Sequence, residues 1–304
     1  MVKPDSEAVF FDHVAILGLG LIGGSLARAL RSSGLTRHVV AFDRDPEQID
    51  TGLATGVIDK GCESAAEAIS GADLIVLAVP VMAVAAVMEE IKPVLSPDSI
   101  LTDVGSVKGY VLKAVEQVFG HVPARFVAGH PIAGSEKHGV AASDGKLFNN
   151  HKVILTPLDS SNPDAVSAIE DMWLSTGATV VMMDAAHHDQ ILAQTSHLPH
   201  LLAYGLIDTL SAQGDSLEIF EYAAGGLRDF SRIAASDPTM WRDIFKSNSD
   251  AVLSILTQYR EELSELQALI EDENFEQLAA VFARSKKARD HFSDVLSRRE
   301  AKRT

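Results

Sequence analysis

Cysteine is almost absent from this chain, which has one, Cys62, among its 304 residues. A single thiol excludes a disulfide within the chain. Long apolar runs are also missing. The apolar stretch over residues 74–88 is interrupted by Pro80 and is shorter than the roughly 20 residues that a membrane-spanning helix needs. We therefore interpret this stretch as a buried strand followed by a helix. No internal repeat or low-complexity segment is visible.

Basic residues are few, with 26 Lys and Arg against 42 Asp and Glu and a net charge of -16. Because the long-range force between two polyanions is repulsive, this composition argues against nucleic acid or an anionic membrane as a partner. Residues 1–11 contain three charged side chains and no apolar core of signal-peptide length, so we expect a cytoplasmic protein. The length exceeds what a single hydrophobic core usually serves, which predicts two domains.

A glycine-rich turn carries the most specific local signal. Residues 14–17 form a short apolar run, Gly18, Gly20 and Gly23 follow in a Gly-x-Gly-x-x-Gly pattern, and a helical pattern over residues 25–30 comes next. In a dinucleotide site the first glycine permits a sharp turn and the second lets the backbone approach a pyrophosphate. The third lets the helix pack close to its strand. The positive end of the helix dipole then faces the phosphates.

The nucleotide is predicted to be NAD. Asp43 closes the second apolar run, where its carboxylate can accept hydrogen bonds from the two ribose hydroxyls and would repel a 2′-phosphate. Arg44, directly after it, is the residue that would favour NADP, which we consider the second choice. The other residues assigned to cofactor binding are Leu21, Ile22, Val79, Pro80 and Asp103.

Short β-rich runs alternate with helical patterns in the first half of the chain, at residues 14–17, 39–42, 74–79, 100–103, 126–128, 153–156 and 180–183. Such alternation predicts parallel strands joined by crossover helices. With the glycine turn it indicates an α/β Rossmann-type nucleotide-binding domain over residues 1–186. From residue 187 onward only helical spacing remains, which predicts an all-α domain over residues 187–304. Its helices carry more apolar positions than a lone small bundle needs, so we expect a homodimer through this domain.

Four polar segments are predicted to meet where the helical domain faces the carboxyl ends of the strands, because ligands bind there in sheets of this kind. Two of them follow strands, beginning at Asp103 and at Gly129, and the other two lie at residues 196–200 and 225–242. His187 and His188 are assigned to the hinge between the domains.

The glycine turn and the four polar segments read GLGLIGGS, DVGSVKG, GHPIAGSE, SHLPH and GGLRDFSRIAASDPTMWRDI, in this order. In this combination they resemble the prephenate and arogenate dehydrogenases of tyrosine biosynthesis over nearly the whole chain. The resemblance implies an NAD-dependent oxidative decarboxylation. A cyclohexadienol loses a hydride from C4 to the cofactor, its C4 hydroxyl proton to a base, and its ring carboxylate as CO2. Prephenate would give 4-hydroxyphenylpyruvate and arogenate would give tyrosine. We expect any feedback inhibition by tyrosine at the substrate pocket, because no added regulatory module is visible.

Under this resemblance His130 is the expected general base, because an imidazole titrates near neutral pH. Ser106 is expected to hydrogen-bond the substrate hydroxyl together with His130. Two structural interpretations stay open at this point. His130 could be a turn residue held by Pro131, and Ser106 could be the N-cap of a helix over residues 107–118.

Arg232 is expected to bind a substrate carboxylate, because its guanidinium presents a planar fork of donors. Arg228 and Arg242 are the alternatives, and a structural ion pair is the other interpretation of Arg232. His197 resembles the family histidine that contacts substrate or bound tyrosine. Pro199 lies between His197 and His200 and no further ligand is apparent, which argues against zinc at this pair. The remaining substrate contacts implied by the resemblance, with solvent exposure or core packing as alternatives, are Ser135 (often threonine in the family), Glu136, Asp229 and Trp241.

Two other functions are compatible with the glycine turn. A two-domain hydroxyacid dehydrogenase would need a lysine and an asparagine one helical turn apart, whereas Lys246 and Asn248 are two residues apart and lie on different helix faces. A non-catalytic NAD-sensing protein would have no use for Ser106, His130 and Arg232 together. The choice between prephenate and arogenate, which differ by one ammonium group, is left open by the sequence.

Overall fold

The computed structural model describes residues 11–134, 137–213 and 216–301. Its two compact units are Met1–Ser249 and Asp250–Thr304. The domain boundary expected after residue 186 falls within the first unit, inside helix α7 (Ala185–Leu192). Residues 187–249 therefore belong to the same compact body as the nucleotide-binding part.

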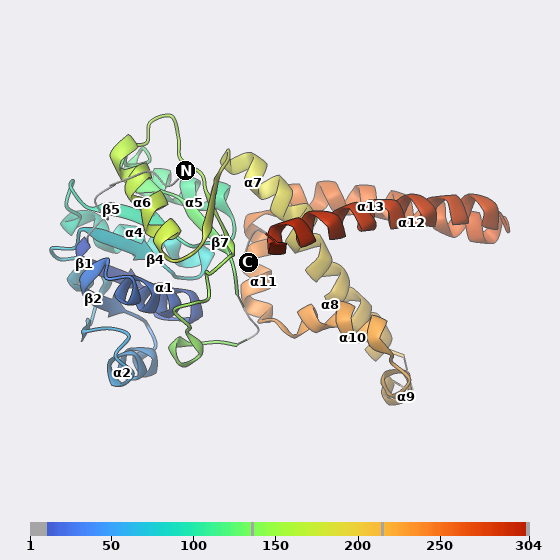
Figure 1. The fold of residues 1–304 in the computed structure, drawn as a ribbon, viewed down its shortest axis with the longest axis horizontal. Coiled ribbons are helices and arrows are strands. Elements are labelled where there is room, and N and C mark those ends of the chain that lie inside the picture. Colours follow the sequence, from blue (N-terminus) through green and yellow to red (C-terminus); the bar gives the residue numbers. More distant parts are fainter. Residues whose placement is uncertain (1–10, 135–136, 214–215, 302–304) are drawn as a thin grey trace. The chain divides into compact units, whose positions relative to one another are not determined.

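A six-stranded parallel sheet forms the centre of the first unit (Figure 1). Its strands are β1 (Phe11–Leu17), β2 (Thr36–Phe42), β3 (Lys60–Gly61), β4 (Leu74–Leu77), β5 (Ile100–Asp103) and β6 (Phe126–Val127), in the order β3-β2-β1-β4-β5-β6. In this register Ile16 lies beside Ala41 on one side and Val76 on the other. From β1 the chain adds β2 and β3 on one side and then β4, β5 and β6 on the other, so the topological switch point lies between β1 and β4. An open sheet of this type binds a ligand at the carboxyl ends of the strands at this point.

Helices cover both faces of this sheet, and the faces follow from the alternation of side chains along β1. Val14 and Ile16 belong to one core, whereas Ala15 and Leu17 belong to the other. Burial on both faces explains the continuous apolar run of β1, since neither face needs polar side chains. The helices of this part are α1 (Leu21–Ser32), α2 (Pro46–Ala54), α3 (Ala65–Ala68), α4 (Val84–Ile91), α5 (Lys108–Phe119) and α6 (Pro163–Ser175), with short 3-10 turns η1 (Val81–Ala83), η2 (Lys92–Val94) and η3 (Val140–Ala142).

A separate three-stranded sheet corrects the expectation that all strands are parallel. It contains β7 (Gly129–Ile132), β8 (Lys152–Leu155) and β9 (Thr179–Met182). β7 is antiparallel to β8, and β8 is parallel to β9. The reason lies in the connections. A parallel pair needs a crossover, which α6 supplies between β8 and β9, whereas the described residues between β7 and β8 contain only the short turn η3.

Helices follow β9, and the fold class predicted from the sequence is confirmed in this respect. After α7 come the π-helical turn η4 (Ala193–His197), α8 (Leu198–Ser211), α9 (Ser216–Glu221), α10 (Gly225–Ser231), the 3-10 turn η5 (Arg232–Ala235) and α11 (Pro238–Ser247). The second unit is built from α12 (Ser249–Glu271) and α13 (Phe275–Ala301). Among the described helices, none is long and apolar enough to cross a bilayer.

Candidate active site

The glycine turn between β1 and α1 has the geometry that the sequence predicts. Gly18 has a φ of +99°, and a Cβ there would lie 2.4 Å from the Ala78 carbonyl oxygen. A Cβ on Gly23 would lie 2.2 Å from the Gly18 carbonyl oxygen. Gly20, the N-cap of α1, has open space where a Cβ would be. The turn therefore presents bare backbone to the space in front of the helix, where Leu21 and Ile22 begin the first turn.

Asp43 lies at the carboxyl end of β2, beside the glycine turn. Its Oδ2 accepts a hydrogen bond from the Leu19 N–H at 2.6 Å, and its Oδ1 accepts one from the Asp45 N–H at 2.9 Å. These bonds fix the carboxylate at the edge of the predicted nucleotide site, while Arg44 is exposed. Val79 and Pro80 follow β4, and the Val79 nitrogen is close to the Cβ position of Gly18.

Asp103, the last residue of β5, has its side chain engaged within the protein. It is fully buried and pairs with the buried ammonium of Lys108. The same ammonium donates to the Gly129 carbonyl at 2.5 Å, and Asp103 Oδ1 accepts from the Gly129 N–H at 3.1 Å. The ion pair thus holds both backbone groups of the residue before His130. A cofactor contact of the Asp103 carboxylate, as predicted from the sequence, would have to compete with its bonds to Lys108 and to the Gly129 N–H.

His130 lies within β7, opposite Ile154, and not in a turn after a strand. The sequence interpretation of a turn histidine held by Pro131 is therefore wrong, because Gly129–Ile132 pairs with β8. The Nδ1 of His130 lies 2.9 Å from the Nε2 of His188. Burial lowers the pKa of His130 well below its ordinary value, and His188, Lys108 and His197 lower it further. His130 is consequently a neutral imidazole at neutral pH.

His188 and Asp189 are the main residues that the sequence interpretation missed. His188 is fully buried in α7, whereas we expected a hinge residue, and its Nδ1 lies 2.7 Å from Asp189 Oδ1. The Asp189 carboxylate also accepts from the Lys108 and Gly109 N–H groups at 2.8 and 2.9 Å. The only local signal was an acid directly after a histidine pair, which is too common to single out a site.

Ser106 is half-buried in the loop between β5 and α5, two residues before Lys108. The alternative interpretation of Ser106 as a helix N-cap is wrong, since Val107 is the N-cap of α5 and makes no capping bond through its side chain. Asp189 supplies the acceptor for the first N–H groups of the helix instead. The Ser106 hydroxyl is thus not committed to capping α5.

A second polar cluster surrounds Trp241 of α11. The His200 ring stacks on the Trp241 indole with centroids 3.7 Å apart, and His197 meets the same indole edge-on at 6.0 Å. Asn248 donates to the Asp189 backbone carbonyl at 2.9 Å and lies 3.1 Å from His197 Nδ1. Trp241 is 6% exposed and belongs to a hydrophobic core. The core interpretation of Trp241 is therefore confirmed, and its contact with the substrate stays a prediction.

Burial also lowers the pKa values of the two histidines in this cluster. The pKa of His197 falls to about 4, with Asp189 opposing the shift and His188 and His200 adding to it. The pKa of His200 is lowered by burial and, to a smaller extent, by the Arg232 guanidinium. Arg232 therefore lies near His200, and it is exposed at the start of η5.

The predicted arginines differ in their surroundings. Arg242 is paired with the neighbouring Asp243 at 2.7 Å. Among the described residues, no carboxylate lies within ion-pair distance of Arg232, which leaves its guanidinium available. Arg228 and Asp229 are exposed on α10. Ser135 and Glu136 lie outside the described residues.

The structure thus connects His130 to the helical cluster within one compact unit. His130 contacts His188, the backbone carbonyl of the next residue, Asp189, accepts from Asn248, and Asn248 lies beside His197. His197 and His200 both contact Trp241. Within the part of the chain that the structure describes, no group of three or more His, Cys, Asp or Glu residues is arranged to hold a metal ion. The cluster is suited to proton transfer and to anion binding.

Acid sensitivity of folding is the first testable consequence. Since the unfolded chain binds protons at these histidines more readily than the folded chain, the free energy of unfolding should fall as the pH drops below about 6.5. For His197, whose pKa is about 4, the loss should approach about 3 kcal/mol at that pH. Urea midpoints between about pH 8 and pH 5 measure this slope. His197→Gln should reduce it, whereas the exposed His187→Gln should not. A midpoint independent of pH would contradict this assignment.

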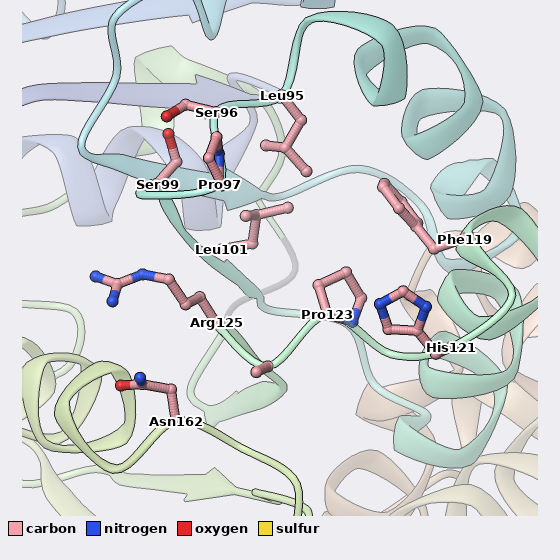
Figure 2. Close-up of a pocket in the computed structure, with 11 residues that line it drawn as sticks. Leu95, Ser96, Pro97, Ser99, Leu101, Phe119, His121, Pro123, Arg125 and Asn162 are labelled. Carbon is pink, nitrogen blue, oxygen red and sulfur yellow. The ribbon is translucent and has the colours of Figure 1, made fainter.

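A surface cavity of about 470 Å³ lies away from this site (Figure 2). Its lining comes from the loops that precede β5 and β6, including Ser96, Pro97, His121 and Arg125. These loops lie at the amino ends of the parallel strands, whereas the predicted site residues lie at the carboxyl ends. Of the predicted site residues that the structure describes, none lines this cavity.

Comparison with known proteins identifies the family to which the chain is similar. Residues 26–182 match the family model described as prephenate dehydrogenase, nucleotide-binding domain, and residues 184–284 match the one described as prephenate dehydrogenase, dimerization domain. A cyclohexadienyl dehydrogenase of Zymomonas mobilis is 38% identical over 92% of this chain and 95% of its own length.

Solved structures show the same likeness. The prephenate dehydrogenase of Aquifex aeolicus in complex with hydroxyphenyl propionate and NAD+ superposes with a TM-score of 0.87 at 36% identity, covering 95% of this chain and all of that one. The arogenate dehydrogenase of Synechocystis gives a TM-score of 0.78 at 28% identity, covering 92% and 99%.

Proposed function

Because this chain belongs to the prephenate dehydrogenase family, we propose that it catalyses the NAD-dependent oxidative decarboxylation of prephenate, arogenate or both. The observation that carries this proposal is the neutral imidazole of His130, whose Nδ1 lies 2.9 Å from His188 Nε2 in the same compact unit as His197 and Arg232. The products would be 4-hydroxyphenylpyruvate and tyrosine, respectively.

The residues around the glycine turn fit a dinucleotide. The open space at Gly20 and the first turn of α1 suit a pyrophosphate, and the Asp43 carboxylate suits the ribose hydroxyls. When bound, NAD supplies the hydride acceptor. We assign the remaining predicted cofactor contacts to Leu21, Ile22, Val79 and Pro80 because they border the same turn and the carboxyl end of β4.

The other residues of the site are assigned to proton transfer and to substrate binding. His130 takes the proton of the substrate hydroxyl through Nε2, and Ser106 orients that hydroxyl. Arg232 binds a substrate carboxylate through its planar fork of donors. His197, held by Asn248, and Trp241 line the substrate side of the cluster. Ser135, Glu136 and Asp229 are further proposed substrate contacts.

Substrate turnover tests the proposal directly. Purified protein with NAD is expected to convert prephenate or arogenate, followed as an increase in nicotinamide absorbance, and side-by-side kinetics identify the preferred compound. Absence of turnover with both compounds would refute the proposal. A hydroxyacid dehydrogenase is disfavoured by Asn248, which is buried and bonded to Asp189 and His197, whereas Lys246 is exposed.

Cofactor preference gives a second prediction. Replacing Asp43 with serine should narrow the ratio of kcat/KM for NAD over NADP, because the repulsion of a 2′-phosphate is lost. Asp45→Ser is the matched control, since it removes a nearby charge and keeps a side chain able to cap α2. An unchanged ratio for Asp43→Ser would assign the preference to Arg44 or to the loop after it.

We also propose a homodimer through the helices. The supporting observation is that the second unit exposes large apolar side chains, among them Leu253, Ile270, Phe275 and Phe282. We propose tyrosine as an inhibitor at the substrate site. It is the product of arogenate oxidation and resembles 4-hydroxyphenylpyruvate, the product from prephenate.

Cytoplasmic residence stays a prediction from the sequence.

A further inference from the structure

We propose that His188 and Asp189 are positioning residues that hold His130 in the tautomer whose Nε2 carries the lone pair needed to remove the substrate proton. This inference rests on the proposed function. It adds a series of hydrogen bonds from a helix-capping carboxylate through a buried imidazole to the base.

The series begins at the Asp189 carboxylate, which is 9% exposed. The N–H groups of Lys108 and Gly109, at the N-terminus of the 12-residue helix α5, donate to its two oxygens. The positive end of a helix dipole stabilises a negative charge at this place. Both oxygens of Asp189 thus accept hydrogen bonds, as those of a carboxylate do.

The tautomers of both histidines follow from this starting point. Since Asp189 Oδ1 can only accept, His188 donates to it through Nδ1–H at 2.7 Å. A neutral His188 then has an acceptor at Nε2, so His130 donates to it through Nδ1–H at 2.9 Å. This leaves the Nε2 of His130 without a hydrogen and able to accept one.

The same series supports His130 during the proton transfer. The O–H bond of the substrate hydroxyl breaks as an N–H bond forms at His130 Nε2, and the ring becomes an imidazolium. Its Nδ1–H becomes a stronger donor to His188 Nε2, and the carboxylate of Asp189 lies behind that ring. The new charge is stabilised without a change in geometry, because the acceptors are already in place.

A purely structural role would not require a histidine at position 188. The side chain is fully buried, and an apolar residue could fill this space without burying polar atoms. Asp189 could cap α5 without it, through the two backbone bonds alone. The imidazole adds something that neither packing nor capping needs, which is an acceptor for His130.

Other charged groups act on His130 and must be included in any pH profile. Lys108 of α5 is paired with Asp103 of β5, and His197 lies on the helical side. None of these groups is changed by a substitution at His188. A shift in the acid limb of kcat/KM in a His188 variant therefore reports the contact between His188 and His130.

Two substitutions separate the two bonds of His188. His188→Asn places an amide near the Nδ1 position, keeping a donor for Asp189 and losing the acceptor for His130. His188→Gln places an amide oxygen near the Nε2 position, keeping that acceptor. We expect His188→Asn to lower kcat roughly 10- to 100-fold with KM values for both substrates within about threefold of the wild type. The acid limb should move to lower pH, because the imidazolium loses its acceptor. His188→Gln should restore most of the rate.

Controls distinguish positioning from folding. The exposed His187→Asn, in the same helix, should have wild-type kinetics. In a His130→Asn background, His188→Asn should cause almost no further loss, because the two residues act as one unit. Wild-type kcat and pH profile in His188→Asn, or an undiminished loss in the double variant, would overturn the proposal.

A measurement on the unmodified protein covers the case in which a variant does not fold. Nitrogen-15 NMR of the imidazole rings at mildly alkaline pH should show that His130 carries its hydrogen on Nδ1 and that its Nε2 is unprotonated. The opposite tautomer would overturn the proposal. This readout needs no turnover, so it is independent of the proposed function, which fails only if the wild type converts neither prephenate nor arogenate.

Discussion

Replacing His130 with asparagine is expected to lower kcat by roughly 10²- to 10⁴-fold while changing the substrate KM little. The reason is that a general base contributes mainly in the transition state. Asparagine is the appropriate replacement because its amide can still donate to His188 from the position of Nδ1, whereas it has no acceptor at the position of Nε2. The measurement is steady-state kinetics with saturating NAD.

The exposed His151→Asn is a suitable control, because it removes an imidazole directly before β8 that is not one of the predicted site residues. If His130→Asn kept a kcat comparable to that of the wild type, His130 would have no part in proton transfer. The pH profile adds a second check. Burial lowers the pKa of His130. The kcat/KM of the wild type should therefore stay undiminished at pH values well below the one at which an ordinary histidine becomes protonated.

Replacing Arg232 with glutamine is expected to raise the substrate KM by about 10- to 150-fold, as a charge-assisted hydrogen-bonded pair of about 1.5 to 3 kcal/mol would predict. The effect on kcat should be smaller, since the carboxylate is bound in the ground state as well. Arg232→Lys should lie between the two, because it keeps the charge and loses the planar fork.

Arg242→Gln is the matched control for this experiment. Arg242 belongs to the same segment, but its guanidinium is paired with Asp243 at 2.7 Å and is not expected to bind substrate. An unchanged KM in Arg232→Gln would move the carboxylate site elsewhere. Arg228, exposed on α10, would then be the next residue to test.

Local rules predicted the glycine turn well. The positive φ of Gly18 is a local property of the backbone, and Gly23 lies against the carbonyl of Gly18 five residues before it, so the spacing of the residues was enough to predict both. The close approach of Gly18 to the Ala78 carbonyl exists only in the folded chain. The strand β4 was likewise predicted from a short apolar run, and the helices after β9 were predicted from helical spacing. The two-residue strand β3 was missed because it is too short to show any period.

Other features needed contacts between distant segments. The antiparallel pairing of β7 depends on the connection to β8, which the alternation of strands and helices does not reveal. Asp103 was predicted to contact the cofactor, yet its partner Lys108 holds the carboxylate inside the protein. His188 was predicted to lie in a hinge together with His187, because a histidine pair before an acid has no distinctive spacing that would indicate a site.

The amino-acid order by itself determined the α/β class with its following helices, the glycine turn for NAD and the residue types available for proton transfer and anion binding. These depend on backbone conformation and on side-chain chemistry, which are properties of neighbouring residues. Only the tertiary structure decided what His130 faces. Its neighbour His188 is 58 positions away, and Asp189 reaches back 81 positions to Lys108. Hydrogen bonds over such separations exist only after the chain has folded, because they require a particular packing of α7 against α5 and β7.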